Sequence, residues 1–113
     1  DITAMAGKAR HRAHAALGPN GNACGFAEVS IREYANGCTK TPVAFLEGIW
    51  VEPKARRSGI GAALLSSMTV ELREEGHVEL CSDARLENLA SHQAHAAWGF
   101  AETQRVVYFR KPL

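Results

Sequence analysis

The sequence predicts an α/β or α+β domain built around one sheet, and two observations carry this prediction. Extended and helical patterns follow each other along the 113 residues in the order hairpin, strand, helix, strand, helix and strand. The stretch RRSGIGAALL, which begins at Arg56, joins the end of an apolar strand to an amphipathic helix through a loop with two glycines. At this length we expect a single domain, 1–113.

The first half of the chain is expected to be mostly strand. The small and basic residues 1–12 are consistent with a helix or an irregular end, and residues 13–17 with a short strand. Turn formers at 18–22 precede an alternating stretch, 23–33, which predicts a strand with room for a bulge. After a loop, the almost wholly apolar stretch 43–53 predicts a central strand buried on both faces.

The second half is expected to alternate helix and strand. Apolar residues at helical spacing predict a helix from Ile60 that ends at Gly76, followed by a short strand over 77–84. A second helix over 86–100 is expected to end at Gly99, and the stretch 102–111 is expected to form the last strand.

The composition excludes several classes of protein. A net charge of +1 without a dense basic stripe argues against nucleic-acid binding. The sequence has neither an apolar run of membrane-spanning length nor a recognisable signal peptide. Its three cysteines, Cys24, Cys38 and Cys81, form no Cys-x-x-Cys pair, which argues against a zinc ribbon and predicts reduced thiols in a cytoplasmic protein.

The glycine loop has the features of a phosphate site. The first N–H groups of a helix have no intrahelical partner, and they lie at the positive end of its dipole. Gly59 and Gly61 allow close approach of a ligand, while Arg56 and Arg57 add positive charge. The alternative interpretation is a tight turn with solvated arginines.

The pattern Arg-x-x-Gly-x-Gly at 56–61 resembles the acetyl-coenzyme A loop of the GNAT acetyltransferase superfamily. This resemblance implies that the loop binds the coenzyme pyrophosphate and that the preceding strand splays and hydrogen-bonds the pantetheine arm. Further along, Asn88, His95 and Gly99-Phe100 match family positions, with His95 in place of the usual tyrosine, so the general acid stays open. The coenzyme contacts implied are Ile49, Trp50, Val51, Arg56, Arg57, Ser58, Gly59, Ile60, Gly61, Ala62, Asn88 and His95.

Longer stretches of the sequence resemble one subgroup of this superfamily. The stretches FLEGIWV, ARRSGIG and CSDARLENLASHQAHAAWGFAETQRVVYFRK closely resemble the aminoglycoside 6'-N-acetyltransferases, and the similarity covers roughly residues 24–113. It implies a GNAT fold, a mixed and mostly antiparallel sheet flanked by helices with a splayed central strand pair. It also implies acetyl transfer from acetyl-coenzyme A to an aminoglycoside 6'-amine, antibiotic resistance and a homodimer. The family has elements ahead of this region, so we expect an N-terminally shortened domain.

An aminoglycoside is a polycation, so its site needs acidic side chains, and a base must help to deprotonate the attacking amine. The resemblance assigns substrate binding and catalysis to Glu47 and Asp83 at the ends of adjacent strands, with Tyr34 as a wall of the substrate cleft. Alternatively, Glu47 forms a structural ion pair with an arginine, Asp83 caps a helix, and Tyr34 is an ordinary loop aromatic.

The remaining candidates are weaker. Tyr108, on the expected last strand, is a candidate to protonate the departing thiolate, or it simply packs. His92 and His95 are spaced i, i+3, as are His11 and His14, but spacing suggests no third ligand, so we expect no metal.

A nucleophilic pair of Cys81 with His95 is disfavoured, because GNAT chemistry is direct transfer. Trp50 and Trp98 are expected in the core or at an interface.

Two rival functions stay open. The first is an N-acetyltransferase that acts on another amine, such as a polyamine or a protein N-terminus. The second is a shortened domain that binds coenzyme A or a partner without turnover. Acetyl transfer to a panel of amines separates them.

Overall fold

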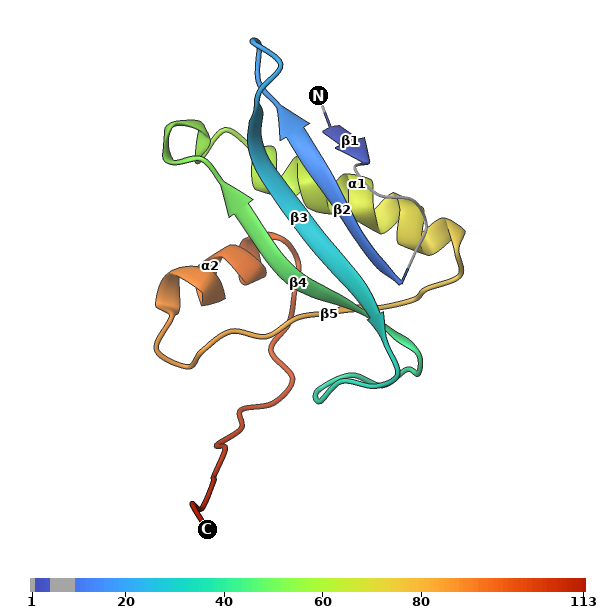
Figure 1. Cartoon of the computed structure of the whole chain (residues 1–113), viewed down its shortest axis with the longest axis vertical. Coiled ribbons are helices and arrows are strands. Elements are labelled where there is room, and N and C mark those ends of the chain that lie inside the picture. The colour runs from blue at the N-terminus through green and yellow to red at the C-terminus, as the bar shows by residue number, and fades with distance from the viewer. Residues whose placement is uncertain (1, 5–9) are drawn as a thin grey trace. The chain divides into compact units, whose positions relative to one another are not determined.

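A computed structural model describes residues 2–4 and 10–113, and the chain divides into two compact units, Asp1–Asp83 and Ala84–Leu113. In the first unit, the described residues form one five-stranded sheet in the order β1-β2-β3-β4-β5 (Figure 1). All neighbouring strands are antiparallel except β4 and β5, which confirms the expected mixed, mostly antiparallel sheet. The strands are β1 Ile2–Ala4, β2 His11–Leu17, β3 Ala23–Arg32, β4 Val43–Val51 and β5 Leu80–Cys81.

The beginning of the chain corrects the sequence interpretation. Ile2–Ala4 and His11–Leu17 are strands, so the helix interpretation of 1–12 is wrong where the structure describes these residues; residues 1 and 5–9 lie outside that description. The cause is tertiary, because β2 buries Arg12 and His14 against helix α1. Buried charged side chains hide the apolar alternation by which a strand is recognised.

Helix α1, Ile60–Glu74, covers one face of the sheet (Figure 1). It buries the apolar side chains Leu64, Leu65, Met68 and Leu72, against Ala27 and Val29 of β3 among others. Burying a leucine or methionine side chain contributes roughly 1.5–3 kcal/mol, so this face accounts for much of the core.

The two ends of α1 are fixed by glycines. At the C-terminal end, Gly76 has φ 92°, and the N–H groups of Gly76 and His77 donate to the carbonyls of Arg73 and Leu72, which confirms the expected termination. At the N-terminal end, a Cβ on Gly25 would lie 2.8 Å from the carbonyl oxygen of Trp50 and 3.3 Å from the Ile60 side chain. Gly25 therefore lets the start of α1 lie directly over β3.

Strand β4 is buried on both faces only in its first half. Residues 43–46 are buried, whereas Glu47 and Trp50 are exposed and Ile49 is half-buried. The expectation of a strand buried throughout is therefore wrong for 47–51. The reason is that β5 pairs with β4 only at Ala44 and Phe45, so beyond that point one edge of β4 has no strand beside it in the described part of the first unit.

Two bulges interrupt the ladders. Ala16 pairs with Gly25 and Leu17 with Ala23, so Cys24 is an extra residue in β3, which confirms the bulge expected in 23–33. Between β3 and β4, the pairing passes from Leu46 to Gly48, which leaves Glu47 as an extra residue. A bulge changes the direction of a side chain and is frequent beside active sites.

The second unit contains helix α2, Leu89–Ala97. The expected second helix is thus confirmed, but it is shorter than the predicted range 86–100. Gly99, at φ 94°, follows its C-terminal end as expected. Residues 101–113 form no strand and are exposed, so the predicted last strand is absent from the structure. A strand exists only through pairing with a neighbour, and an apolar pattern cannot supply one. No helix among the described residues is long and apolar enough to cross a membrane.

Candidate active site

The segment between β4 and α1 folds tightly onto itself. A 3-10 turn, Pro53–Ala55, follows β4, and the Arg56 Nε donates back to the carbonyl of Val51 at 3.0 Å. The Ser58 hydroxyl donates to the carbonyl of Ala55. Arg56 therefore does more than add charge, because it fastens the loop to the end of the strand.

The N-terminal end of α1 is left open to a ligand. Gly59 is the N-cap at φ 83°, and it offers no capping side chain, while the first turn contains no acidic residue. The first intrahelical bond runs from Ala63 N–H to the Gly59 carbonyl at 3.0 Å. The N–H groups of residues 60–62 thus have no intrahelical acceptor at the positive end of a 15-residue helix.

Arg57 also has a positive φ, 65°, which is uncommon outside glycine. Such backbone strain gathers at ligand sites. Arg56, Arg57, Ser58 and Gly59 are all exposed. These features favour an anion site over a tight turn with solvated arginines.

The open edge of β4 leads from this loop to the middle of the sheet. Ile49 and Val51 are half-buried, and Trp50 is 43% exposed with its ring 6.1 Å from that of Phe26. Trp50 is therefore not a core residue, which leaves its expected roles at an interface and as a coenzyme contact. Backbone groups on an unpaired strand edge can hydrogen-bond an extended ligand.

The bulged residue Glu47 lies on the face of the sheet away from α1 and is bound by β3. Its carboxylate accepts two hydrogen bonds from Arg32, at 2.6 and 2.8 Å, and one from the Ser30 hydroxyl. Hydrogen bonding by Arg32, reinforced by that of Ser30, lowers the pKa of Glu47 below its usual range. The guanidinium of Arg32 lies 3.7 Å above the centre of the Phe45 ring, which fixes its plane.

These contacts match the alternative interpretation of Glu47 as one half of an ion pair. They do not remove it from reach of a ligand, because 27% of its side chain remains exposed. The lowered pKa makes Glu47 a weak proton acceptor near neutral pH, so its chemistry is that of a fixed negative charge.

Asp83 is exposed and follows β5 by two residues. The pKa of Arg32 is raised, chiefly by its hydrogen bond to Glu47 and also by the charge of Asp83, so all three belong to one electrostatic cluster. Helix α2 begins at Leu89, and its cap is Asn88, whose side chain accepts from Ser91 N–H at 3.1 Å. The interpretation of Asp83 as a helix cap is therefore wrong.

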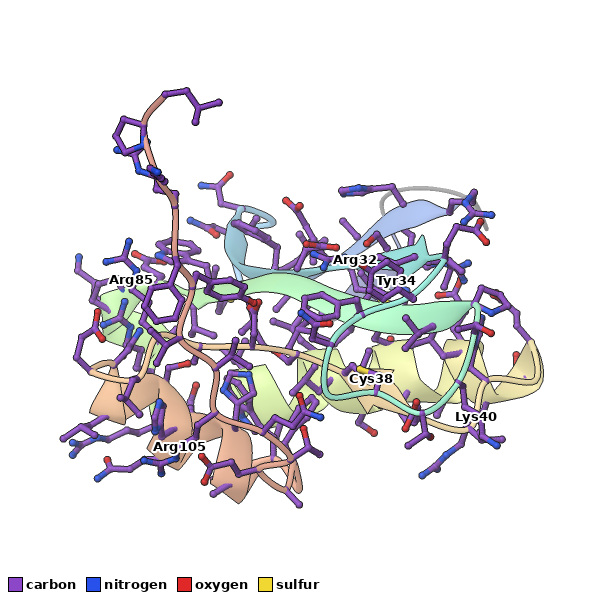
Figure 2. The ribbon with its side chains drawn as sticks, turned by 90° about the horizontal axis from the view of Figure 1, so that it is seen from below. Arg32, Tyr34, Cys38, Lys40, Arg85 and Arg105 are labelled. Atoms are coloured by element: carbon purple, nitrogen blue, oxygen red, sulfur yellow. A yellow bond between two sulfur atoms is a disulfide. The ribbon has the colours of Figure 1, made fainter. Side chains whose placement is uncertain are left out.

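Tyr34 lies in the loop 33–42 between β3 and β4 and is 70% exposed (Figure 2). The same loop contains Cys38, whose sulfur is bonded to that of Cys81 in β5. The expectation of three reduced thiols is thus wrong for this pair, because the fold brings together two cysteines 43 positions apart. In a disulfide, Cys81 is no nucleophile, and Cys24 is the free cysteine of the described residues.

The other expected contacts, Asn88, His95 and Tyr108, belong to the second unit. Asn88 caps α2, and the Nδ1 of His95 lies 2.7 Å from the carbonyl of Ser91. Tyr108 is 79% exposed in the segment without secondary structure. Trp98 is half-buried beside His95, with ring centres 5.7 Å apart. Their roles toward coenzyme or leaving group stay predictions.

The histidine spacings have separate explanations. His92 binds the Arg85 carbonyl at 2.9 Å through Nε2. His11 and His14 lie on a strand, where i, i+3 residues point to opposite faces; His11 is exposed and His14 buried. Among the described residues, Cys38, Glu79 and Cys81 form the group with metal-ligand spacing, but its sulfurs are bonded to each other.

Sequence reasoning missed Arg32 and Ser30. Both lie on β3 at i and i+2, so they share a face with each other, and β3 pairs with the strand that carries Glu47. The signal that was available is the row of polar residues Glu28, Ser30 and Arg32 at alternate positions, on one face of the strand. Their partner was not predictable, because it depends on the register in which β3 pairs with β4.

The mixed sheet, the uncapped N-terminal end of α1 and the open edge of β4 together are the features expected of an acetyltransferase of the GNAT class. The model of the acetyltransferase (GNAT) family matches residues 4–100, and the chain belongs to this family. An aminoglycoside N(6')-acetyltransferase type 1 of Stenotrophomonas maltophilia is 50% identical over 99 residues, 87% of this chain. The match covers 65% of that relative, so the chain spans a little under two thirds of its length.

Solved structures agree. The aminoglycoside antibiotic 6'-N-acetyltransferase AAC(6')-Ih from Acinetobacter baumannii is 42% identical, with a TM-score of 0.86 over 95% of this chain and 74% of its own. AAC(6')-Iy in complex with the bisubstrate analog CoA-S-monomethyl-acetylneamine is 40% identical, with a TM-score of 0.83 over 92% of this chain and 71% of its own.

Proposed function

We propose that the protein transfers an acetyl group from acetyl-coenzyme A to the 6'-amine of aminoglycoside antibiotics and thereby contributes to antibiotic resistance. The observation that carries this proposal is the uncapped N-terminal end of α1 beside the open edge of β4. Relatives with aminoglycoside acetyltransferase names at 50% identity support the choice of substrate.

We expect the coenzyme to lie along these elements, from the N-terminal end of α1 to the middle of β4. Its pyrophosphate would accept hydrogen bonds from the N–H groups of residues 60–62, with Arg57 adding charge. The pantetheine arm would extend along Ile49 to Val51, where β4 lacks a neighbour, and the thioester would then reach the face that carries Glu47. The protein's contribution is orientation, since holding the reactants in place removes much of the barrier.

The chemistry is a direct transfer. The neutral 6'-amine attacks the thioester carbonyl, a C–N bond forms, the C–S bond breaks, and the amine loses a proton. Glu47 and Asp83 supply fixed negative charge that binds the remaining ammonium groups, and Tyr34 forms a wall beside them. The lowered pKa of Glu47 makes it a weak proton acceptor, and Asp83 is the other candidate for the base, directly or through water. Tyr108 is the proposed proton donor to the thiolate.

The coenzyme assignment is tested at Gly59. Valine there would force a β-branched residue into φ 83° and place a side chain in the path of the pyrophosphate. We expect coenzyme A affinity, measured by calorimetry, to fall by about 100-fold or more, since several charge-assisted hydrogen bonds are lost.

Gly21→Val is the matched control. Gly21 has nearly the same φ, 81°, and nothing lies within 4 Å of its added Cβ, but it belongs to the turn at 18–22. Its melting temperature should fall while coenzyme affinity is retained. Retained affinity in Gly59→Val would contradict the assignment.

The rival functions give different results with the same protein. Turnover of a polyamine or a peptide N-terminus in preference to kanamycin would favour the first rival. Coenzyme A binding with no acetyl transfer to any amine would favour the second. Steady-state assays with acetyl-coenzyme A and this panel decide among the three.

Three further proposals accompany this function. Both units belong to one acetyltransferase domain, because the family match extends over residues 4–100.

The protein forms a homodimer through the exposed apolar segment 106–109, which has no strand partner within the described chain. A monomer mass by light scattering at micromolar concentration would contradict this. The protein acts in the cytoplasm on a small-molecule substrate, without a nucleic acid or a membrane as partner.

A further inference from the structure

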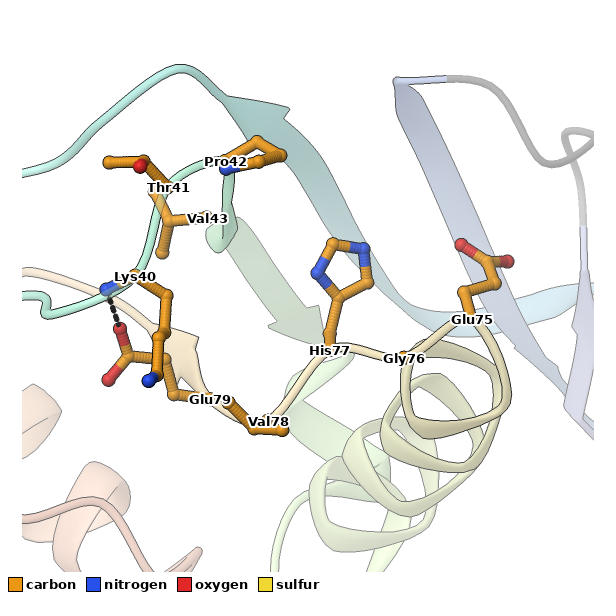
Figure 3. Close-up of a pocket in the computed structure, with 9 residues that line it drawn as sticks. All are labelled: Lys40, Thr41, Pro42, Val43, Glu75, Gly76, His77, Val78 and Glu79. Carbon is orange, nitrogen blue, oxygen red and sulfur yellow. Dashed lines mark hydrogen bonds between the residues drawn. The ribbon is translucent and has the colours of Figure 1, made fainter.

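The loop 33–42 is fastened to the β5 segment at two points. The Glu79 carboxylate accepts hydrogen bonds from the backbone N–H groups of Thr39 and Lys40, at 2.8 and 2.9 Å, the second of which Figure 3 shows. The disulfide between Cys38 and Cys81 is the second point. These residues are 39 to 43 positions apart in the chain, so both attachments are tertiary.

The two attachments differ in chemistry. The hydrogen bonds to Glu79 form in any redox state, and those from the Thr39 and Lys40 N–H groups keep the pKa of Glu79 below its usual range. The disulfide is made and broken by thiol exchange, and such bonds in a reducing compartment are usually transient and regulatory. The loop therefore has one permanent and one switchable attachment.

The attachment matters for the proposed substrate site, because the loop and the β5 segment each carry a candidate substrate residue. Tyr34 lies four residues before Cys38, and Asp83 lies two residues after Cys81. Both are substrate candidates, and Asp83 acts on Arg32, which binds Glu47. The bond between Cys38 and Cys81 thus connects the segment that carries Tyr34 to the segment that carries Asp83.

We propose that Cys38 and Cys81 form a redox-sensitive latch that fixes the loop 33–42 and thereby sets affinity for the aminoglycoside. The effect on affinity rests on the proposed function, whereas the latch itself does not. Oxidation by a small-molecule disulfide, such as oxidised glutathione, converts the two thiols to one disulfide and releases two molecules of the small thiol, which take up the two protons. A dithiol such as dithiothreitol reverses the step.

Two measurements test the latch without catalysis. The chain has three cysteines, so thiol titration of the intact protein should find one free thiol after oxidised glutathione and three after dithiothreitol. Lys40 is an exposed tryptic site within the loop, and its cleavage should become faster on reduction. Three free thiols in the oxidised protein, or the same rate of cleavage at Lys40 in both redox states, would overturn the proposal.

The variants separate the latch from general thiol effects. Trypsin should cleave Cys38→Ser at Lys40 as fast as it cleaves reduced wild type, in either redox state. Cys24→Ala should keep the full redox response, because Cys24 is outside the disulfide. Glu79→Gln removes the charge that strengthens the permanent attachment, so its cleavage rate should respond to reduction more strongly than wild type. A response of Glu79→Gln no larger than that of wild type would contradict the two-point attachment.

The kinetic consequence is a change in KM. Reduction frees one aromatic side chain and its loop, so KM for kanamycin should rise about fivefold, with KM for acetyl-coenzyme A unchanged. An unchanged kanamycin KM alongside faster cleavage would defeat the effect on affinity. Absence of acetyl transfer in both redox states would instead defeat the proposed function, and thiol count and cleavage would still decide the latch.

Discussion

Two clusters of arginine and carboxylates lie on opposite faces of the same sheet and are used differently. The inner cluster joins β2 to α1: Arg12 Nη1 lies 2.6 Å from Glu75 and 3.2 Å from Glu71, and His14 bridges Glu71 at 2.5 Å and Ser67 at 2.8 Å. The outer cluster consists of Ser30, Arg32, Glu47 and Asp83.

Exposure separates the two clusters. The Arg12 side chain is 3% exposed, whereas those of Arg32 and Glu47 are 40% and 27% exposed. Buried charges stay paired with each other, because leaving one of them unpaired would cost several kcal/mol of stability. Charges at a half-open surface can exchange part of their solvation for a ligand. The same residue types therefore stabilise the fold on one face and are available for binding on the other.

The largest expected effect is at the inner cluster. Glu71→Ala removes one carboxylate from Arg12 and the carboxylate partner of His14, so the free energy of unfolding should fall by about 3–5 kcal/mol in urea denaturation. Glu74→Ala, an exposed carboxylate on the same helix, should stay within about 0.5 kcal/mol. Equal effects of the two variants would remove the distinction between the faces.

Asp83→Asn should affect activity and not stability. Loss of a charge-assisted contact in the occupied site should cost roughly 2–3 kcal/mol of transition-state stabilisation, about a 30- to 150-fold loss in kcat/KM for kanamycin. Coenzyme affinity and melting temperature should hardly change, because Asp83 caps no helix. Glu74→Gln, which changes an exposed carboxylate on α1, is the control and should keep full activity. A fully active Asp83→Asn enzyme would rule out the substrate role.

Glu47→Gln is expected to show a smaller effect on stability, because the pair with Arg32 is partly solvated. We expect a loss of about 1 kcal/mol, or about 4 °C in Tm. A loss of kcat/KM well beyond this, with so small a change in Tm, supports a substrate ligand. A large fall in Tm that accompanies the lost activity would instead identify a structural ion pair.

The smallest expected effect is the pH dependence of that same pair. The folded pKa of Glu47 is lowered, so its stabilising contribution is complete above its unfolded pKa of about 4.3 and is lost as pH falls through the folded value. The stability gap between wild type and Glu47→Gln, measured by urea denaturation, should be constant from about pH 7 to 5 and close below about pH 4. A gap that persists at low pH would exclude the ionised pair as its source.

Local patterns in the sequence by themselves determine much of this protein. The glycines at 59, 76 and 99 set the start of α1 and the ends of α1 and α2, because helix termination depends on a single backbone conformation. The apolar alternation predicts β3, and the six residues of the Arg-x-x-Gly-x-Gly pattern, 56–61, are enough to indicate the phosphate-like loop. Family resemblance then selects the coenzyme and substrate class.

Only the tertiary structure decides which groups meet. Arg32 finds Glu47 because the register between β3 and β4 brings the two side chains to one face, and Cys38 finds Cys81 across 43 positions. The strand expected at 102–111 failed for the same reason, since an apolar pattern states a preference but pairing requires a neighbour. The backbone conformation at a glycine depends on a local free energy, so the sequence predicts it. Hydrogen-bond, charge and disulfide partners depend on distances that only the folded chain sets.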